Sequence, residues 1–175
     1  MDLSIDEEQK EIVRISDELN KIHGRSWFRY KGDVVARTVI SLLKPHVVGS
    51  CSVVGPSVYV EGYPTEFDAL VVEKGVSSVP GTAAYRKDDV KLLIEIKKHG
   101  FYYRKTKGEY EIGKYFQAFR DVGKPFLYLT VRESSTFISA TQKILGEDSF
   151  FLGVSYGKPR EGEWNRFVER VSRLL

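Results

Sequence analysis

The sequence of 175 residues has little of several residue types, and each shortage excludes a class of protein. Cys51 is the single cysteine, which excludes an intramolecular disulfide framework and a zinc site built from several cysteines. No apolar run approaches the roughly 20 residues that span a bilayer, and the first twenty residues lack the apolar core of a secretory signal. We therefore expect a reduced, cytoplasmic protein that makes no membrane contact.

The net charge is also small, so composition alone does not predict a polyanionic partner. Lys and Arg number 27 against 24 Asp and Glu, which gives a formal net charge of +3 at pH 7. Charged residues make up 29% of the chain and Cys and Met occur once each, a balance that favours a thermophilic source. With 42% hydrophobic residues the chain can bury a substantial core, and residues 1–175 are expected to form one domain.

Helical and strand patterns alternate along the chain. Ser4 and Glu7 have the spacing of a capping box ahead of a first helix, and Asp33 is the expected cap of a second helix that Pro45 ends. A hairpin or tight bend is expected at Gly55. Strands are predicted at 46–54, 57–63, 66–72, 90–98, 125–131 and 150–156. Helices are predicted at 4–22, from Asp33 to Pro45, at 109–121, at 139–145 and from Trp164 to Val171.

This order predicts an α/β fold in which a mixed sheet carries helices on both faces. Asp68 lies near the start of one apolar strand, while Glu95 and Lys97 share one face of another. If the two strands pair, these three side chains meet, with Glu66 as a further acid. Carboxylates that converge in a sheet need a cation, and their oxygens suit Mg²⁺ or Mn²⁺. A metal site at this point of the sheet is therefore predicted.

The aspartate followed by the tripeptide "EIK" at 95–97 resembles the PD-(D/E)XK nuclease superfamily, which has the restriction-endonuclease-like fold. The resemblance implies an α-β-β-β-α-β core at about 33–131, an extra N-terminal helix and a C-terminal α-β-α extension. It also implies that Asp68, Glu95 and the backbone carbonyl of Ile96 bind the metal, while Lys97 assists the attacking water. The activity implied is Mg²⁺-dependent hydrolysis of DNA, with endonuclease action favoured over exonuclease action.

The sequence departs from the family pattern in two places. Phe67 stands where a proline usually precedes the aspartate. The segment "YKGDVVARTVISLL" resembles the opening helix of archaeal Holliday-junction resolvases, but it has Ala36 where that helix supplies a glutamate. Whether Glu11 or Glu18 of the first helix supplies an acid instead stays open at this point.

A basic segment follows the strand that carries Glu95. Five Lys or Arg and three aromatic residues, but no acid, lie between Lys97 and Lys107. Cations interleaved with aromatic rings suit the phosphates, sugars and bases of DNA, although a solvated basic loop is the plain alternative. DNA is the expected partner, and a homodimer is left open. The expected DNA-binding residues are Lys98, Tyr102, Tyr103, Arg104, Lys105 and Lys107.

Two alternative functions use the same region of the sequence. "VVGSCS" followed by "EFDALVV" resembles polymerase-β-type nucleotidyltransferases, in which a Gly-Ser turn holds a triphosphate and three acids hold two metals. That resemblance gives Lys97 no role. The third alternative is a nucleic-acid-binding module without catalysis. The nucleotidyltransferase site would consist of Gly49, Ser50, Glu66, Asp68 and Glu95.

Overall fold

The structure is a computed structural model that describes residues 3–22, 28–99, 105–106, 109–110, 112–153 and 159–175. Its helices are α1 (Ile5–Asn20), α2 (Phe28–Leu43), α3 (Ile112–Asp121), α4 (Ser135–Leu145) and α5 (Glu163–Leu174). The main sheet contains β1 (Cys51–Val54), β4 (Ala69–Glu73), β6 (Val90–His99), β9 (Phe126–Arg132) and β10 (Ser149–Phe151). A smaller sheet contains β2 (Val58–Val60), β3 (Glu66–Phe67) and β5 (Ala84–Tyr85). A hairpin is formed by β7 (Lys105–Thr106) and β8 (Glu109–Tyr110).

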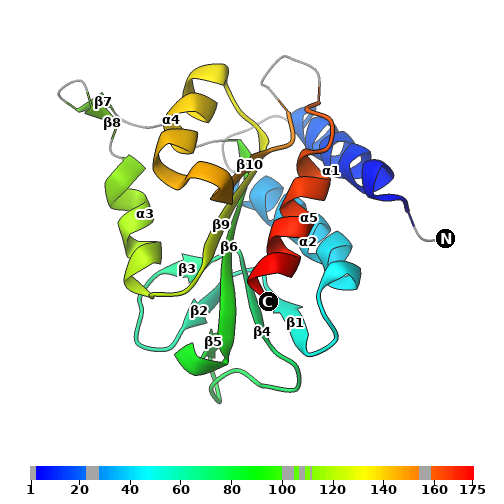
Figure 1. The fold of residues 1–175 in the computed structure, drawn as a ribbon. Helices are drawn as coiled ribbons and strands as arrows, with labels where there is room; N and C mark the ends of the chain where they lie inside the picture. Colours follow the sequence, from blue (N-terminus) through cyan, green and yellow to red (C-terminus); the bar gives the residue numbers. More distant parts are fainter. Residues whose placement is uncertain (1–2, 23–27, 100–104, 107–108, 111, 154–158) are drawn as a thin grey trace.

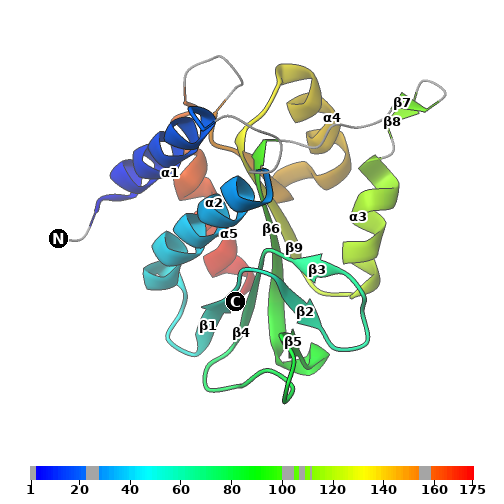
Figure 2. The same ribbon diagram turned by 180° about the vertical axis from the view of Figure 1, so that it is seen from behind.

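The main sheet is mixed, as the sequence predicts. Its strand order is β1-β4-β6-β9-β10, with antiparallel pairs at β1/β4 and β4/β6 and parallel pairs at β6/β9 and β9/β10. Helices α1, α2 and α5 pack on one face, and α3 and α4 pack on the other (Figures 1 and 2). The predicted α/β fold with helices on both faces is therefore confirmed.

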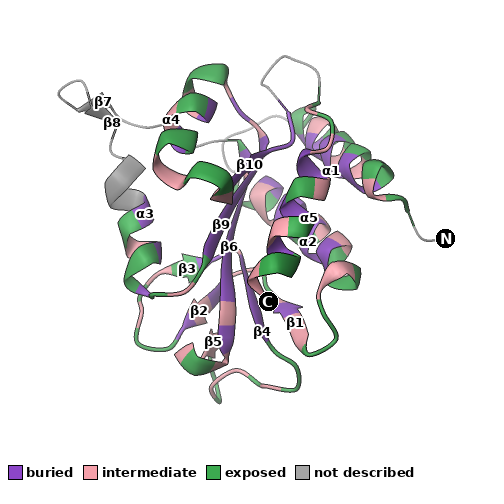
Figure 3. Ribbon diagram, in the orientation of Figure 1, coloured by how far each residue is buried: buried purple, intermediate pink, exposed green. Residues whose placement is uncertain are grey.

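Both faces of the central strand β6 are covered, so its side chains divide between two apolar clusters. Ile94 and Ile96 belong to the cluster under α1, α2 and α5, whereas Leu93 belongs to the cluster under α3 and α4. Figure 3 shows that the middle strands are buried along most of their length. A strand buried on both faces has a nearly continuous apolar sequence, so Glu95 and Lys97 are exceptions that need a reason.

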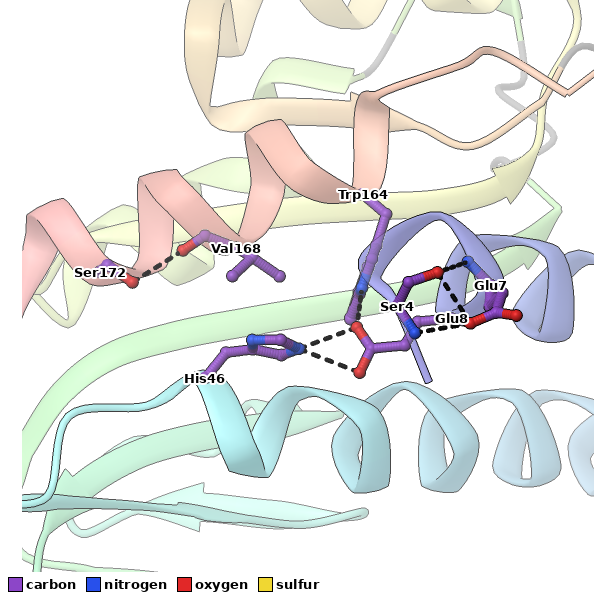
Figure 4. A network of polar contacts seen from close by, with 7 residues as sticks. All are labelled: Ser4, Glu7, Glu8, His46, Trp164, Val168 and Ser172. Atoms are coloured by element: carbon purple, nitrogen blue, oxygen red, sulfur yellow. Dashed lines mark hydrogen bonds and ion pairs between the residues drawn. The ribbon is translucent and has the colours of Figure 1, made fainter. Parts of the chain in front are cut away.

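The N-terminal helix α1 is joined to the C-terminal helix α5 by polar contacts. The predicted capping box is present, since the Glu7 N–H donates to Ser4 Oγ at 3.4 Å and the Ser4 N–H donates to Glu7 Oε2 at 2.7 Å. The carboxylate of Glu8, which is 5% exposed, accepts from Trp164 Nε1 at 2.7 Å and lies 2.8 Å from His46 Nε2 (Figure 4). These contacts hold α1 against α5 and His46.

The helix boundaries differ from the prediction at two N-termini. The second helix begins at Phe28, so Asp33 lies inside it and does not cap it. Lys31 is buried, and it lies four residues before Val35 on the same face of α2. The aliphatic part of its side chain extends the buried stripe of α2 by one turn toward the N-terminus. Helix α4 begins at Ser135 because Ser134 caps it, accepting from the Phe137 N–H at 3.4 Å.

The strand predictions differ from the structure in detail. Of the two alternatives at Gly55, the bend is present and the hairpin is not, because β1 pairs with β4 while β2 joins the smaller sheet. The predicted strand at 66–72 is interrupted at Asp68, which separates β3 from β4.

The predicted helix at 109–121 begins only at Ile112, since β8 pairs with β7 before it. None of the helices in the described part of the chain has the length and apolar character needed to cross a membrane.

Candidate active site

Asp68 occupies the break between β3 and β4, where the chain passes from the smaller sheet to the main one. Gly55 packs against its backbone: a Cβ at Gly55 would overlap the Asp68 carbonyl oxygen and lie 2.8 Å from Ile40 Cδ1. Gly55 also has φ +149°, a conformation that side chains rarely adopt. Glycine at this position therefore allows the close approach that places Asp68 next to β6.

The Asp68 carboxylate continues the pairing of β4 with β6 beyond the end of the strand. The backbone ladder pairs Ala69 with Ile94, and Asp68 Oδ2 then accepts from the Ile96 N–H at 2.8 Å. The same oxygen accepts from Lys97 Nζ at 2.9 Å. One carboxylate oxygen is thus fixed by two donors of the central strand.

Glu95 and Lys97 point to the same face of β6 as Leu93, because side chains alternate along a strand. Glu95 is only 2% exposed, and its Oε1 forms an ion pair with Lys97 Nζ. The Lys97 ammonium therefore contacts both Asp68 and Glu95. The structure brings together the three side chains that the sequence places in one site.

The charge of Lys97 follows from these contacts. Burial alone would lower its pKa, but the carboxylates of Glu95 and Asp68 outweigh burial and raise the pKa above its ordinary value. The Lys97 ammonium is therefore protonated at neutral pH in this arrangement. It is a positive charge held between two acids.

The donor set fits a hard divalent cation that keeps part of its water shell. No group of three or more His, Cys, Asp or Glu side chains in the described segments lies close enough to hold a metal. Mg²⁺ is commonly bound by one or two carboxylates, with water and substrate phosphate completing the shell. Asp68 and Glu95 supply two carboxylates, and Ile96 between Glu95 and Lys97 offers a backbone carbonyl.

Glu66 lies on β3 and has partners of its own. Its Oε2 accepts from the Tyr59 hydroxyl at 3.0 Å. A hydrogen bond from Ser57 lowers the pKa of Glu66 more than burial raises it, and the charges of Arg29 and Lys97 lower it further. Glu66 is therefore a charged group near the site. Sequence patterns did not indicate Arg29 or Tyr59, because α2 and β2 come near Glu66 only in the fold.

The Gly-Ser turn of the alternative nucleotidyltransferase site lies elsewhere. Cys51 pairs with Glu73, and the Lys74 N–H donates to the carbonyl of Ser50 at 2.9 Å. Ser50 and the adjacent Gly49 are therefore near the end of β4 that is remote from Asp68, roughly 17 Å along the strand at ~3.3 Å per residue. The structure does not bring this turn to the acids, because β1 runs antiparallel to β4.

The predicted DNA-binding residues are only partly described. Lys98 lies on the α1 side of β6, and its Nζ contacts Asn20 Oδ1 and, at 2.8 Å, His99 Nε2. Burial, with the charge of Lys31, lowers the pKa of Lys98 to about 8. Lys105 is in β7, and its side chain is not described. Tyr102, Tyr103, Arg104 and Lys107 lie outside the described residues.

The acids of the first helix have other partners. Glu11 pairs with Arg14 at 2.7 Å, and Glu18 pairs with Lys21 at 2.8 Å, on exposed parts of α1. Both pairs join residues three positions apart on the helix surface. Neither contact involves Asp68, Glu95 or Lys97.

No protein-family model matches the sequence, and no curated protein matches it. Among solved structures, NucC of P. aeruginosa ATCC27853 in its cAAA-bound form superposes with a TM-score of 0.62 at 12% identity, covering 97% of this chain and 88% of NucC. The chain has the restriction-endonuclease-like fold. NucC of E. coli MS115-1, also cAAA-bound, superposes with a TM-score of 0.54 at 13% identity, covering 85% of this chain and 69% of that protein. The expected restriction-endonuclease-like fold is thus confirmed.

Proposed function

We propose that the protein is a metal-dependent DNA endonuclease with Asp68, Glu95 and Lys97 in its active site. The observation that carries the proposal is the contact of one ammonium, Lys97 Nζ, with the carboxylates of both acids at the junction of β4 and β6. The fold, which NucC shares, and the pattern of Asp68 followed by Glu95 and Lys97 resemble those of PD-(D/E)XK nucleases. The match of fold and residue pattern supports hydrolysis of phosphodiester bonds.

Asp68, Glu95 and the carbonyl of Ile96 are the groups that would hold Mg²⁺ or Mn²⁺. When bound, such a cation lowers the pKa of a coordinated water and stabilises negative charge on the phosphate. The Ile96 N–H holds the Asp68 carboxylate in place, and burial restricts Glu95. Lys97 carries a proton on Nζ and is therefore a donor that orients the attacking water or a phosphate oxygen.

DNA is the proposed substrate, and the basic segment from Lys98 to Lys107 is proposed to contact it. Arg29 and Tyr59 lie beside Glu66 and extend the polar surface near the acids. Lys and Arg that contact phosphates release counterions, so affinity for DNA would fall steeply with salt. Association into a homodimer stays a prediction.

The test is incubation of the protein with labelled duplex, branched and single-stranded DNA in Mg²⁺, in Mn²⁺ and in EDTA. We expect cleavage only with a metal, and a loss of more than about 100-fold in Asp68→Ala, because this carboxylate serves the chemistry. Binding of DNA by Asp68→Ala should be largely kept. Cleavage by Asp68→Ala at the rate of the unmodified protein would refute the assignment.

The matched control for this test is Ser50→Ala. Ser50 lies at the other end of β4, so the variant should cut DNA as the unmodified protein does. Parallel incubation with nucleoside triphosphates tests the nucleotidyltransferase alternative. Nucleotide incorporation that Ser50→Ala abolishes, without any DNA cleavage, would replace the nuclease by that alternative.

A further inference from the structure

A second group of charged residues lies at the same end of the sheet as the proposed active site. Lys98 follows Lys97 directly, so its side chain leaves β6 on the opposite face, toward α1 and α2. His99 is aligned with Arg132 of the neighbouring strand β9. We call Lys31, Lys98, His99 and Arg132 the cation cluster.

Among the described residues, the two ammonium groups of the cation cluster contact neutral groups. Lys98 Nζ contacts Asn20 Oδ1 and lies 2.8 Å from His99 Nε2, which is 3.3 Å from the same Asn20 oxygen. Lys31 Nζ donates to the carbonyl oxygen of Ile22. These contacts orient the two ammonium groups but do not neutralise them.

Positive charge therefore exceeds negative charge in the cluster. The charges that act on His99 are those of Lys98, Arg132 and Lys31, opposed by Asp17, so in the described part of the chain three cations face one carboxylate. Asp17 Oδ2 pairs with Arg132 Nη2 at 2.8 Å. Burial and these cations lower the pKa of His99 to about 4, so its ring is neutral at pH 7 and accepts from the Lys98 ammonium.

Buried positive charges that lie close together favour an anion between them. Lys31 and Lys98 are 7% and 9% exposed, so water screens their repulsion poorly. His99 and Asn20 are exposed, and they leave the cluster open to solvent on one side. Arg132 lies against Gly153, where an added Cβ would be 3.0 Å from Nη1. A phosphate group has the charge and the several acceptor oxygens that suit two ammoniums and a guanidinium.

We propose that the cation cluster binds a phosphate of the DNA strand that passes the active site, a few nucleotides from the bond that is cut. The proposal rests on the proposed function, since it takes DNA as the substrate. Lys97 and His99 are two residues apart, roughly 7 Å along β6. Phosphates of one strand succeed each other at ~3.4 Å along the duplex axis. Because the cluster lies on the opposite face of β6 from Lys97, one strand would reach both sites by passing around the end of β6 at His99. The cluster would thereby fix the register of the DNA.

The variant Lys98→Met tests the proposal, because it removes the charge and keeps an apolar stem. We expect DNA affinity to fall about tenfold and the slope of log affinity against log salt to flatten by about one unit. Binding is measured in an Asp68→Ala background, so that cleavage does not interfere. The matched control is Lys91→Met at the opposite end of the same strand, paired with Glu73, which should bind DNA as the Asp68→Ala protein does.

A variant with the opposite expected sign excludes loss of folding as the cause. Asp17→Asn removes the carboxylate that, within the described segments, opposes the cluster, so DNA affinity should rise about threefold or more. Damage to the fold could only lower it. If neither Lys98→Met nor Asp17→Asn changes DNA affinity relative to Lys91→Met, the proposal is wrong.

Inorganic phosphate is the probe that separates the two sources of a phosphate group. A loss of DNA affinity in Lys98→Met supports the proposal. This holds whether or not free phosphate, added at constant ionic strength, raises the Tm. Phosphate that raises the Tm of the unmodified protein but not of Lys98→Met, with equal DNA affinity of the two, would overturn the proposal in favour of a separate phosphorylated ligand. If DNA is bound through the cluster but never cut, the proposed function fails while the phosphate site stands.

Discussion

Asp68 Oδ2 accepts a hydrogen bond from the Ile96 N–H at 2.8 Å, across 28 positions of sequence. This bond joins the start of β4 to the central strand β6 and brings the Asp68 carboxylate to Lys97. The candidate site is therefore built from the register of two paired strands. Strands buried on both faces hold side chains more precisely than loops do, which suits a site that must position a water and a phosphate.

Lys97→Met should lower the rate of DNA cleavage by more than about 100-fold. It should also lower the stability of the protein in the absence of metal. Asp68 and Glu95 would lose the ammonium between them, and because Glu95 is 2% exposed the free energy of unfolding should fall by up to about 3 kcal/mol. Mg²⁺ should then raise the Tm of Lys97→Met more than that of the unmodified protein. Thermal unfolding in EDTA and in Mg²⁺ measures both effects.

Lys91→Met is the control for this prediction, since Lys91 lies on the same strand and pairs with Glu73 at 2.5 Å on the surface. It should change cleavage and stability little, because ion pairs on the surface contribute little. Equal responses of the Lys97 and Lys91 variants to Mg²⁺ would show that the acids do not share a cation.

Gly55→Ala should impair both stability and cleavage. The added Cβ would overlap the Asp68 carbonyl oxygen and approach Ile40 Cδ1 to 2.8 Å, so the backbone that carries Asp68 must shift. We expect a loss of at least about 2 kcal/mol in the free energy of unfolding and a lower kcat. Urea unfolding and single-turnover cleavage measure the two effects.

Gly62→Ala separates the clash from the backbone conformation. Gly62 has φ +84° and nothing within 4 Å of an added Cβ, so alanine there suffers only the unfavourable φ. The loss should be about 1 kcal/mol, with kcat per folded molecule unchanged. If the two glycine variants have the same kcat, Gly55 does not position Asp68.

Local patterns in the sequence were sufficient to select the three residues that the structure brings together in the candidate site. Alternation along β6 places Glu95 and Lys97 on one face, and charged residues inside an apolar strand indicate a role other than packing. The capping box at Ser4 and Glu7 was predicted for the same reason, because both residues belong to one helical turn.

Long-range pairing could not be predicted from the same patterns. Val54 is aligned with Leu70 of β4, and the chain bends after Gly55 into the smaller sheet, whereas the sequence left a hairpin and a tight bend as alternatives. The cation cluster depends on α1 and α2 lying over one end of β6, which no spacing in the sequence shows. The basic segment after His99 was predicted as a DNA contact, but Lys31 and Arg132 were not.

Glu133→Gln should stabilise the protein at alkaline pH. Glu133 is 5% exposed, and burial raises its pKa from 4.5 to about 7, against the opposing effect of the Ser134 N–H. Between these values the folded state binds more protons than the unfolded state, so stability is lost as the pH rises from 4.5 to 7. The variant avoids this loss, and its advantage should reach up to about 3 kcal/mol at pH 8 and vanish near pH 4.

Urea unfolding of Glu133→Gln at several pH values measures this effect. In the unmodified protein the Ser134 N–H donates to Glu133 Oε1 at 2.7 Å. The amide oxygen of glutamine can accept the same hydrogen bond. Glu147→Gln is the control for the substitution itself, because the Glu147 side chain is 73% exposed and the variant removes no buried carboxyl group. A pH-independent difference between Glu133→Gln and the unmodified protein would contradict the assigned pKa.

Glu8→Ala should destabilise the domain without altering the active site. The Glu8 carboxylate accepts from the indole N–H of Trp164 at 2.7 Å and contacts His46, while Trp164 itself is fully buried (Figure 4). Removing the carboxylate leaves the buried indole N–H without its acceptor, at a cost of about 2 to 4 kcal/mol in the free energy of unfolding.

Two variants are controls. Glu8→Gln keeps an acceptor for Trp164 and should lose less stability than Glu8→Ala. Glu18→Ala, at an exposed ion pair, should lose less than about 0.5 kcal/mol. Urea unfolding gives the order of stability, and cleavage per folded molecule should be equal in all three. If Glu8→Ala is as stable as Glu18→Ala, the contact with Trp164 does not hold α1 to α5.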